Sequence, residues 1–375
     1  MVAVLAACGG SGMSEGAGAA TGCRTASCRL TDAVNELAAT GGGPPGVIVV
    51  VQHGAATQTF SAGVADLDTG APPEATDAMR LASVAKAFSG AAALALVSQG
   101  RLSLDDTVGK WLPTLPSTWS GITLRQLLDH TSRIPDFSRQ KAFAQALTAN
   151  LQQPPPPVDL LSSVEGLPLL TVGGDGYSYS NSDNIIVGLM VQAATGQPYE
   201  AVLQSDVFGP LGLTQTSLPS DSALPAPFIH GYDIEPPGAE DVSTLFAAGW
   251  TWASGGVVST PLEASTFVRG YVGGRLFGKA TQTAQRQFIA GSSEPPGPGT
   301  NAVGLGLFRY TTSCGTVYGH TGNTPGYTQF IASTADGSRS VTVSVNAQIT
   351  PTVNSELFGQ LRNIDLLGVC DALGR

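Results

Sequence analysis

Short runs rich in β-branched residues stand near both ends of the chain. Residues 46–52 and 58–65 have the composition of two strands joined by a short turn. Near the other end, residues 326–333 and 338–345 flank Asp336-Gly337, a dipeptide typical of hairpin turns. The pattern therefore predicts one strand pair from each end of the chain.

Helical patterns lie beside and between these strands. A helix is expected over 31–39, before the Gly/Pro run 41–45, and another over about 353–367. Thr123 and Thr260 stand where N-caps belong, each followed three residues later by Gln or Glu. We therefore expect an α+β fold, in which one antiparallel sheet built from both chain ends is flanked by helices and carries an inserted, mainly α-helical lobe.

The same pattern predicts how the chain is divided. Residues 31–375 should form one domain, with an α/β part over about 31–105 and 255–375 and the helical lobe over about 106–254. The two ends of this domain should then be neighbours in space.

Residues 1–30 are expected to be a truncated lipoprotein-type signal and a flexible tether. Cys8 lies in Leu5-Ala6-Ala7-Cys8-Gly9, which resembles the lipid-attachment box of bacterial lipoproteins, and residues 9–21 are rich in Gly, Ser and Ala. Only seven residues precede Cys8, and none is basic. Either the start is placed too late, which we favour, or the box is accidental. We expect an exported protein, a cell envelope lipoprotein or a secreted one.

Composition and charge exclude several classes of partner. Charged residues make up 12% of the chain and the net charge is −10, with no run of basic residues, so a nucleic-acid partner is not expected. The apolar run 91–97 is far shorter than the roughly 20 residues of a membrane span. Membrane attachment would therefore depend on lipid at Cys8, and the sequence assigns no oligomeric state.

The four remaining cysteines are Cys23, Cys28, Cys314 and Cys370. No C-x-x-C pair and no Cys/His cluster occurs, so we expect no metal and no other cofactor. The first two can close a small loop and the last two a long one. Free buried thiols are the alternative, but even pairing fits an oxidising compartment better.

Ser83-Val84-Ala85-Lys86 opens an Ala-rich apolar segment that runs to Gln99. Residues three apart on a helix share one face, so Lys86 can reach the Ser83 hydroxyl. The Ser83 N–H, in the first turn, has no partner within the helix and can stabilise an oxyanion. Lys86 can take the hydroxyl proton only if burial lowers its pKa from about 10.4 towards neutrality.

The S-x-x-K motif alone is weak evidence for a catalytic serine, but two further motifs follow it in the expected order. Tyr179-Ser180-Asn181 comes 96 positions after Ser83, and His320-Thr321-Gly322 comes 237 positions after it. With these elements the chain resembles the serine β-lactamases and penicillin-binding DD-peptidases. The resemblance runs from about Thr31 to Cys370 and includes ITLRQLLDHTSRIP at 122–135.

Tyrosine in the second motif and histidine in the third look most like secreted actinobacterial D-alanyl-D-alanine carboxypeptidases. Cys314 and Cys370 also look like the disulfide of that branch. The resemblance implies that Ser83 attacks a carbonyl and that Lys86 and Tyr179 share the abstraction of its proton. Which of these two is the acylation base stays open, and Tyr179 would pass the proton to the leaving group.

The remaining site residues follow from the same resemblance. Asn181 would hold Lys86 and donate to a substrate carbonyl, and His320, mostly neutral at pH 7, would lead into Thr321 and Gly322. Gly322 would let a substrate backbone lie against its strand, and the Asn323 N–H would be the second oxyanion donor.

The aromatic and histidine residues outside these motifs carry a weaker signal. Trp250 would border the groove, with core packing as the alternative, which is favoured for Trp252. His130 is expected at a structural helix end, and His53 and His230 in loops.

Two positions depart from the family pattern. Phe308 stands where related carboxypeptidases place an arginine for the substrate carboxylate, and the neighbouring Arg309 should point to the opposite face of its strand. Arg133 stands where a glycine is usual, which matters if the turn needs positive φ.

The sequence thus indicates a serine hydrolase that forms an acyl-enzyme through Ser83. It should resemble a DD-peptidase, with possible β-lactam binding, and act on a small-molecule or peptidoglycan-type peptide substrate. A carboxylesterase or β-lactamase on the same scaffold is the alternative. A non-catalytic cell-envelope binding protein is the alternative of another class.

Overall fold

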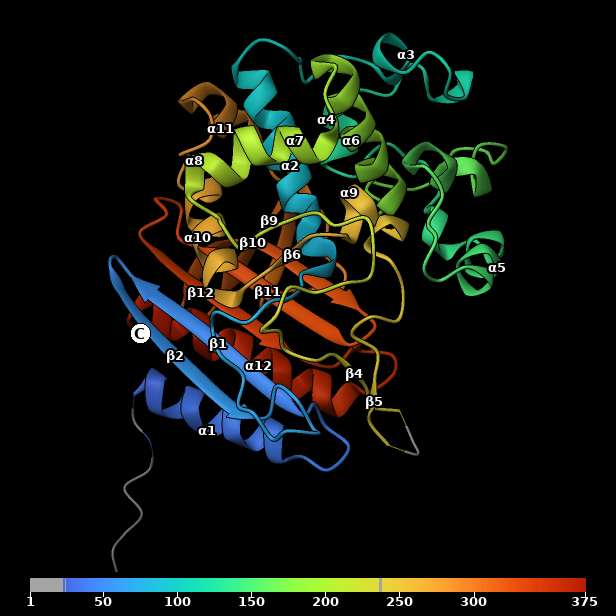
Figure 1. Ribbon diagram of the computed structural model, residues 1–375. Coiled ribbons are helices and arrows are strands. Elements are labelled where there is room, and N and C mark those ends of the chain that lie inside the picture. The colour runs from blue at the N-terminus through green and yellow to red at the C-terminus, as the bar shows by residue number, and fades with distance from the viewer. Residues whose placement is uncertain (1–22, 24, 236–237) are drawn as a thin grey trace, which may run out of the picture.

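The computed structural model describes residue 23, residues 25–235 and residues 238–375 (Figure 1). The signal predicted around Cys8 and the tether predicted over 9–21 lie outside the described residues.

An antiparallel sheet of eight strands forms the centre, in the order β2-β1-β12-β11-β10-β9-β8-β7. β1 and β2 come from the beginning of the chain and the other six strands from its end. Val47 of β1 lies opposite Val345 of β12, which confirms a sheet built from both chain ends. The strands are β1 (Gly46–His53), β2 (Ala56–Gly63), β7 (Ile289–Ala290), β8 (Thr300–Gly304), β9 (Leu307–Thr312), β10 (Gly315–Thr324), β11 (Tyr327–Ser333) and β12 (Arg339–Val345).

Two short strand pairs stand apart from this sheet. β3 (Met79–Arg80) pairs with β6 (Val258–Ser259), and β4 (Tyr232–Asp233) pairs with β5 (Glu240–Asp241). The first pair links the segment before Ser83 to the segment after the helical lobe.

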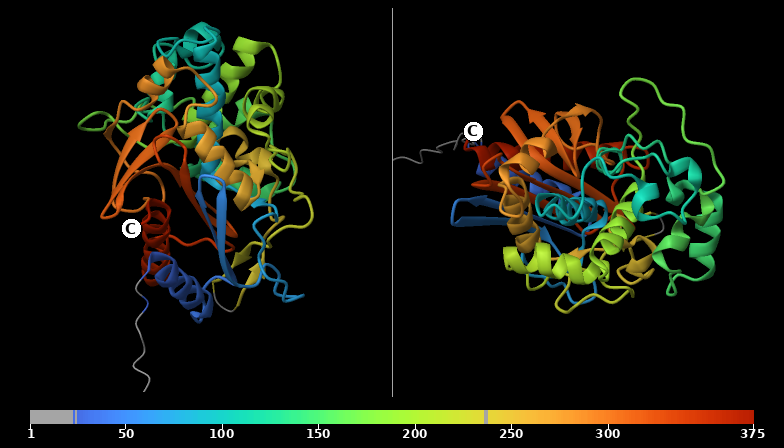
Figure 2. Two further views of the ribbon diagram at one scale, coloured as in Figure 1. Left: turned by 90° about the vertical axis from the view of Figure 1, so that its left-hand side faces the viewer. Right: turned by 90° about the horizontal axis from the view of Figure 1, so that it is seen from above.

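Helices cover both faces of the central sheet (Figure 2). α1 and α12 pack side by side on one face, while α2 and α10 lie on the other face, where the helical lobe continues the packing. The helices are α1 (Ala26–Ala39), α2 (Ala85–Ser98), α3 (Val108–Trp111), α4 (Leu124–Leu128), α5 (Lys141–Ala149), α6 (Asn181–Thr195), α7 (Tyr199–Leu203), α8 (Gly209–Leu211), α9 (Trp252–Gly255), α10 (Pro261–Val272), α11 (Lys279–Gln285) and α12 (Ser355–Leu373).

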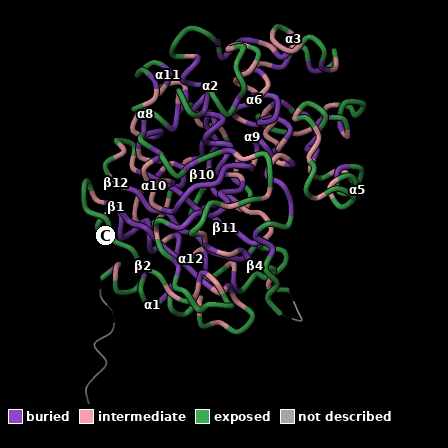
Figure 3. Tube along the Cα trace, viewed as in Figure 1, coloured by how far each residue is buried: buried purple, intermediate pink, exposed green. Residues whose placement is uncertain are grey.

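Buried side chains follow these layers, and Figure 3 shows the central strands and α2 as mostly buried. One core lies between the sheet and the α1/α12 pair, and a larger one surrounds α2 and fills the lobe. The expected caps are present, because the Thr123 hydroxyl accepts from the Gln126 N–H and the Thr260 hydroxyl accepts from the Glu263 N–H.

Both terminal helices are longer than the sequence pattern predicts. α1 begins at Ala26 instead of residue 31, because Thr25 caps it by accepting from the Cys28 N–H. α12 runs to Leu373 instead of about 367 and ends at Gly374, which has φ +70°. The Ser27 hydroxyl donates to Asp371, which joins the two helices.

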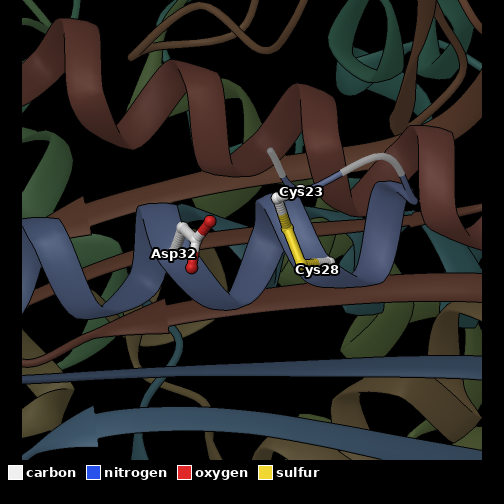
Figure 4. A group of neighbouring side chains, drawn as sticks. All are labelled: Cys23, Cys28 and Asp32. Atoms are coloured by element: carbon white, nitrogen blue, oxygen red, sulfur yellow. A yellow bond between two sulfur atoms is a disulfide. The ribbon is translucent and has the colours of Figure 1, made fainter. Parts of the chain in front are cut away.

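The described residues contain two disulfides, Cys23–Cys28 and Cys314–Cys370. Asp32 lies beside the first (Figure 4), but both sulfurs are consumed by the disulfide, so these cysteines offer no thiolate to a metal. Among the described helices, none is both long and apolar enough to cross a membrane.

Candidate active site

Ser83 lies in a 3₁₀ turn, Ala82–Val84, that leads directly into α2. Ala82 before it has φ +50°, an uncommon conformation for a residue with a side chain, and such backbone often occurs at functional sites. The turn is held between two segments, since the Leu81 N–H donates to the Val257 carbonyl and Gly322 of β10 lies against Ser83. Ser83 itself is partly exposed.

Lys86 lies one turn further along, with 1% of its surface exposed. Its Nζ is 2.9 Å from the Ser83 Oγ, 2.6 Å from the Asn181 Oδ1 and 2.7 Å from the Ser254 carbonyl oxygen. Burial lowers the pKa of Lys86 to about 7, although Asp136, Glu294 and Asp183 act in the opposite direction. A substantial fraction of this amine is therefore neutral near pH 7, beside a hydroxyl.

Asn181 is the first residue of α6, and its side-chain amide faces two ways. Its oxygen accepts from Lys86, while its Nδ2 lies 2.9 Å from the Asp136 Oδ2 and 2.9 Å from the Ser138 Oγ. The expected contact with Lys86 is thus made. Both amide hydrogens are already engaged, however, so a substrate carbonyl would have to displace one of these partners.

Tyr179 places its ring beside the same amine, and Lys86 Nζ lies 5.0 Å from the ring centroid. The buried hydroxyl has no hydrogen-bond partner among the described residues, although Ser83 lies near enough to lower its pKa. Burial has the larger effect and raises the pKa of Tyr179 well above its usual value. This hydroxyl therefore stays protonated near pH 7.

His130 supports Tyr179, which the sequence did not indicate. It does follow helix α4, with φ +57°, but its ring centroid is 4.7 Å from that of Tyr179. Its Nδ1 lies 2.8 Å from the Asp183 Oδ2, and both side chains are almost fully buried. Burial lowers the pKa of His130 to about 3 and raises that of Asp183 well above its usual value. The His130 carbonyl also accepts from the Ser178 N–H.

Gly322 brings β10 against Ser83. A Cβ at this position would lie 2.3 Å from the Leu81 carbonyl oxygen and 3.2 Å from the Ser83 nitrogen. The packing of the turn that carries Ser83 thus already requires a glycine here, in addition to any requirement from substrate.

The Asn323 side chain is anchored away from Ser83, because its Nδ2 donates to the Ile349 carbonyl at 2.6 Å. Its backbone behaves differently. Thr324 and Tyr327 flank a two-residue turn, and such flanking pairs exchange hydrogen bonds, so the next pair, Asn323 and Thr328, does not. The Asn323 N–H therefore points away from β11.

His320 and Thr321 occupy opposite faces of β10. His320 is 1% exposed, its ring lies 5.0 Å from that of Phe308, and burial lowers its pKa to about 3, so it is neutral. The Thr321 hydroxyl donates to the Pro295 carbonyl at 2.7 Å and lies on the α12 side of the sheet. The structure thus does not bring this hydroxyl to Ser83.

Trp250 packs beside α5 in the helical lobe, with its ring centroid 5.8 Å from that of Phe143. It lines a cavity of about 630 Å³ with α5 residues such as Phe143, and neither Ser83 nor Lys86 contributes to that lining. Its Nε1 donates to the Asn150 carbonyl. Trp252 packs on Tyr199, so core packing accounts for it.

The two departures from the family pattern have a clear geometry. Phe308 is fully buried against His320, while Arg309 points to the other face, with its guanidinium 4.8 Å from the Phe288 ring centroid. Arg133 has φ +63°, so the turn does adopt the conformation that favours glycine.

Sequence reasoning missed Asp136, Ser138 and the Ser254 carbonyl. Asp136 and Ser138 follow the family stretch directly, and Asp136 caps the 3₁₀ turn Phe137–Arg139 by accepting from the Ser138 N–H. An Asp-x-Ser cap signal is visible in the sequence, but its contact with Asn181 depends on the fold.

The family model described as Beta-lactamase matches residues 30–363 of the chain. Penicillin-binding protein 4* of Bacillus subtilis (strain 168) is 28% identical over 46% of this chain and 37% of its own length. Protein flp of Staphylococcus aureus (strain NCTC 8325 / PS 47) is 29% identical over 51% of this chain and 38% of its own. The matched region thus spans well under half the length of these curated relatives.

Solved structures match nearly the whole chain. A D-stereospecific amidohydrolase from Streptomyces sp. has a TM-score of 0.75 at 28% identity and covers 89% of this chain and 97% of its own. A D-amino acid amidase from Ochrobactrum anthropi SV3, complexed with L-phenylalanine, has a TM-score of 0.77 at 22% identity, with coverage of 92% and 98%. An octameric penicillin-binding protein homologue from Pyrococcus abyssi has a TM-score of 0.72 at 19% identity, with coverage of 93% and 77%. The last two show the fold alone.

Proposed function

This chain belongs to the Beta-lactamase family of serine hydrolases, and from that membership we propose that Ser83 attacks a substrate carbonyl with Lys86 as its base. The observation that carries the proposal is the position of the Lys86 Nζ, buried and 2.9 Å from the Ser83 Oγ. With a pKa of about 7, Lys86 can accept a proton at neutral pH. Tyr179 is the weaker candidate for the base, because its hydroxyl stays protonated.

The acylation step follows from this arrangement. As the Ser83 oxygen bonds to the carbonyl carbon, its proton moves to Lys86, and the carbonyl oxygen becomes negative. The N–H groups of Ser83 and Asn323 are the proposed donors to that oxygen. The tetrahedral intermediate then collapses and the bond between the carbonyl carbon and the leaving group breaks. Tyr179 gives its proton to that leaving group and takes one from Lys86. Water releases the acyl group by the reverse sequence.

We propose a DD-peptidase-like substrate, a peptide or amide with a D-configured residue at the reacting carbonyl. The three motifs support this choice, as does likeness to proteins named as penicillin-binding and as a D-stereospecific amidohydrolase. Specific D-alanyl-D-alanine carboxypeptidase activity is the sharpest form of the proposal. Release of D-Ala from a peptidoglycan-type peptide, above the level of a Ser83→Ala control, would support it.

A carboxylesterase or amidase that needs no terminal carboxylate is the second candidate. Phe308 favours it, because the chain has this residue where the related carboxypeptidases place an arginine, and the neighbouring Arg309 packs over the Phe288 ring. Rapid turnover of short acyl esters, together with no D-Ala release, would favour this candidate. A non-catalytic binding protein is disfavoured by the contact between Lys86 and Ser83.

The deciding experiment is the intact mass of the protein at short and long times after a penicillin is added, beside Ser83→Ala. We expect a lasting adduct that the variant lacks, because the acyl group would be trapped on Ser83. Sustained lactam hydrolysis would instead identify a β-lactamase. No adduct and no loss of lactam would contradict the penicillin-binding part of the proposal.

We also propose that the protein is exported. The even pairing of four cysteines in two disulfides supports this, because disulfides persist in oxidising compartments. Mass spectrometry of the membrane fraction of the native host would test for lipid on Cys8. Unmodified Cys8 in that fraction would contradict the lipoprotein form of the proposal.

A further inference from the structure

An ion pair joins the helical lobe to the far end of the sheet beside the catalytic residues. Arg139 ends the 3₁₀ turn before α5, and Glu294 lies in the loop between β7 and β8. The Arg139 Nη2 is 2.5 Å from the Glu294 Oε2, and the two side chains are 59% and 50% exposed. The pair is therefore open to solvent.

Arg139 and Glu294 each lie next to a residue that contacts the candidate active site. The Arg139 Nε lies 3.8 Å from the Asp136 Oδ2, the same oxygen that accepts from Asn181. On the other side, Pro295 follows Glu294 and accepts from Thr321 of β10. Only the Asp136 carboxylate thus separates the Arg139 guanidinium from Asn181. Glu294 precedes Pro295, which contacts β10.

Breaking the ion pair between Arg139 and Glu294 costs little free energy. Exposed ion pairs contribute about 0–1 kcal/mol, because both charges are already well solvated. A guanidinium binds any carboxylate through two parallel hydrogen bonds, so a substrate carboxylate can take the place of the Glu294 carboxylate. Arg309, the cation nearest in sequence to the usual position, packs instead over the Phe288 ring, with its guanidinium carbon 4.8 Å from the ring centroid.

We propose that Arg139 is a specificity-determining residue, which binds the terminal carboxylate of the substrate's leaving group after that carboxylate displaces Glu294. Arg139 then supplies from the helical lobe the cation that Phe308 cannot supply from the sheet. Glu294 acts in the opposite sense, because it competes for the guanidinium and repels a second carboxylate. This inference rests on the proposed acyl-enzyme function.

The test compares one peptide in two forms, diacetyl-L-Lys-D-Ala-D-Ala and its C-terminal carboxamide. The measured quantity is the ratio of kcat/KM for the acid to kcat/KM for the amide. We expect Arg139→Gln to lower this ratio about tenfold, equivalent to about 1.4 kcal/mol, and Arg139→Lys to restore part of it. Glu294→Gln should raise the ratio, since the competitor is removed.

Arg101→Gln is the matched control, because Arg101 is an exposed arginine that donates to the Ala194 carbonyl. Its ratio should equal that of the wild type. A wild type that cleaves either peptide, with a ratio unchanged in Arg139→Gln, would overturn this inference and leave the proposed function intact. A wild type that cleaves neither peptide and forms no Ser83 adduct with penicillin would overturn both.

Discussion

Lys86 and Asp365 are two buried ionisable residues that lie on opposite faces of the sheet. Lys86 is 1% exposed on the α2 side, and Asp365 is 4% exposed on the α12 side, next to Thr321 of β10. Burial moves both pKa values to about 7, downward from 10.5 for the lysine and upward from 3.8 for the aspartate. The same physical cause thus gives two side chains that titrate near neutrality.

The partners of the two residues differ. Lys86 has three oxygen atoms within 3 Å, one of them the Ser83 hydroxyl. Asp365 has Arg362 at 3.8 Å, and within the part of the chain that the structure describes its Oδ1 has no hydrogen-bond partner. A perturbed pKa alone therefore does not mark a catalytic residue. Contact with a nucleophile separates the two, and each prediction below tests that separation.

The largest expected effect is the loss of acylation when Lys86 is replaced. In Lys86→Met the side chain stays unbranched and apolar along its stem but has no amine to accept the Ser83 proton. We expect the rate of adduct formation, measured by intact mass, to fall about 10³-fold, within the range for a lost general base. Asp365→Asn is the matched control and should acylate at the wild-type rate. Equal losses in both variants would remove the distinction between the two residues.

The pH dependence of acylation separates Lys86 from Tyr179 as the base. A base must be unprotonated, so with a pKa of about 7 for Lys86 the rate should rise about 50-fold from pH 5 to pH 7 and level off above pH 8. Stopped mixing with a chromogenic lactam or ester gives the profile. A rate that keeps rising beyond pH 9 would instead indicate the Tyr179 phenolate, whose pKa is raised well above its usual value.

Much of the sheet could be predicted from the sequence, because strand patterns and hairpin turns are local signals. The residues paired as β11 and β12 were identified to within one residue. The start of α1 was missed because it depends on the cap by Thr25 and on the neighbouring Cys23–Cys28 disulfide. Neither feature changes the spacing of apolar residues from which the helix was predicted. The end of α12 was missed because its last turns face the sheet and the second disulfide.

The residues of the candidate site divide in the same way. Ser83, Lys86 and Asn181 stand in short motifs at fixed spacings, and the structure brings them into contact. Asp136 and His130 reach the site only through tertiary packing, which no spacing in the chain encodes. For Trp250 the sequence left a groove position and core packing open, and the structure places its side chain beside Phe143 in the wall of a cavity of the helical lobe.

Asp365 itself gives the smallest effect, on stability. Its pKa is raised in the folded state, so the folded protein binds more protons than the unfolded chain between pH 3.8 and about 7. The contribution of this residue to stability is therefore lost as the pH rises through that range. The difference between the two pKa values corresponds to about 4 kcal/mol at most. We expect Asp365→Asn to raise the free energy of unfolding by about 1–3 kcal/mol at pH 8, with little change at pH 4.

Denaturant unfolding at several pH values measures this effect, and Lys86→Met provides the opposite sign. The pKa of Lys86 is lowered on folding, so between pH 7 and 10.5 the unfolded chain binds more protons and the wild type gains stability as the pH rises. Above pH 7 the free energy of unfolding of the wild type should therefore rise relative to that of Lys86→Met. Between pH 4 and 7 it should fall relative to that of Asp365→Asn. Two variants with the same pH trend would show that burial does not control both residues. Opposite trends would support the view that burial controls both residues, and the contact with Ser83 would remain the feature that distinguishes Lys86 from Asp365.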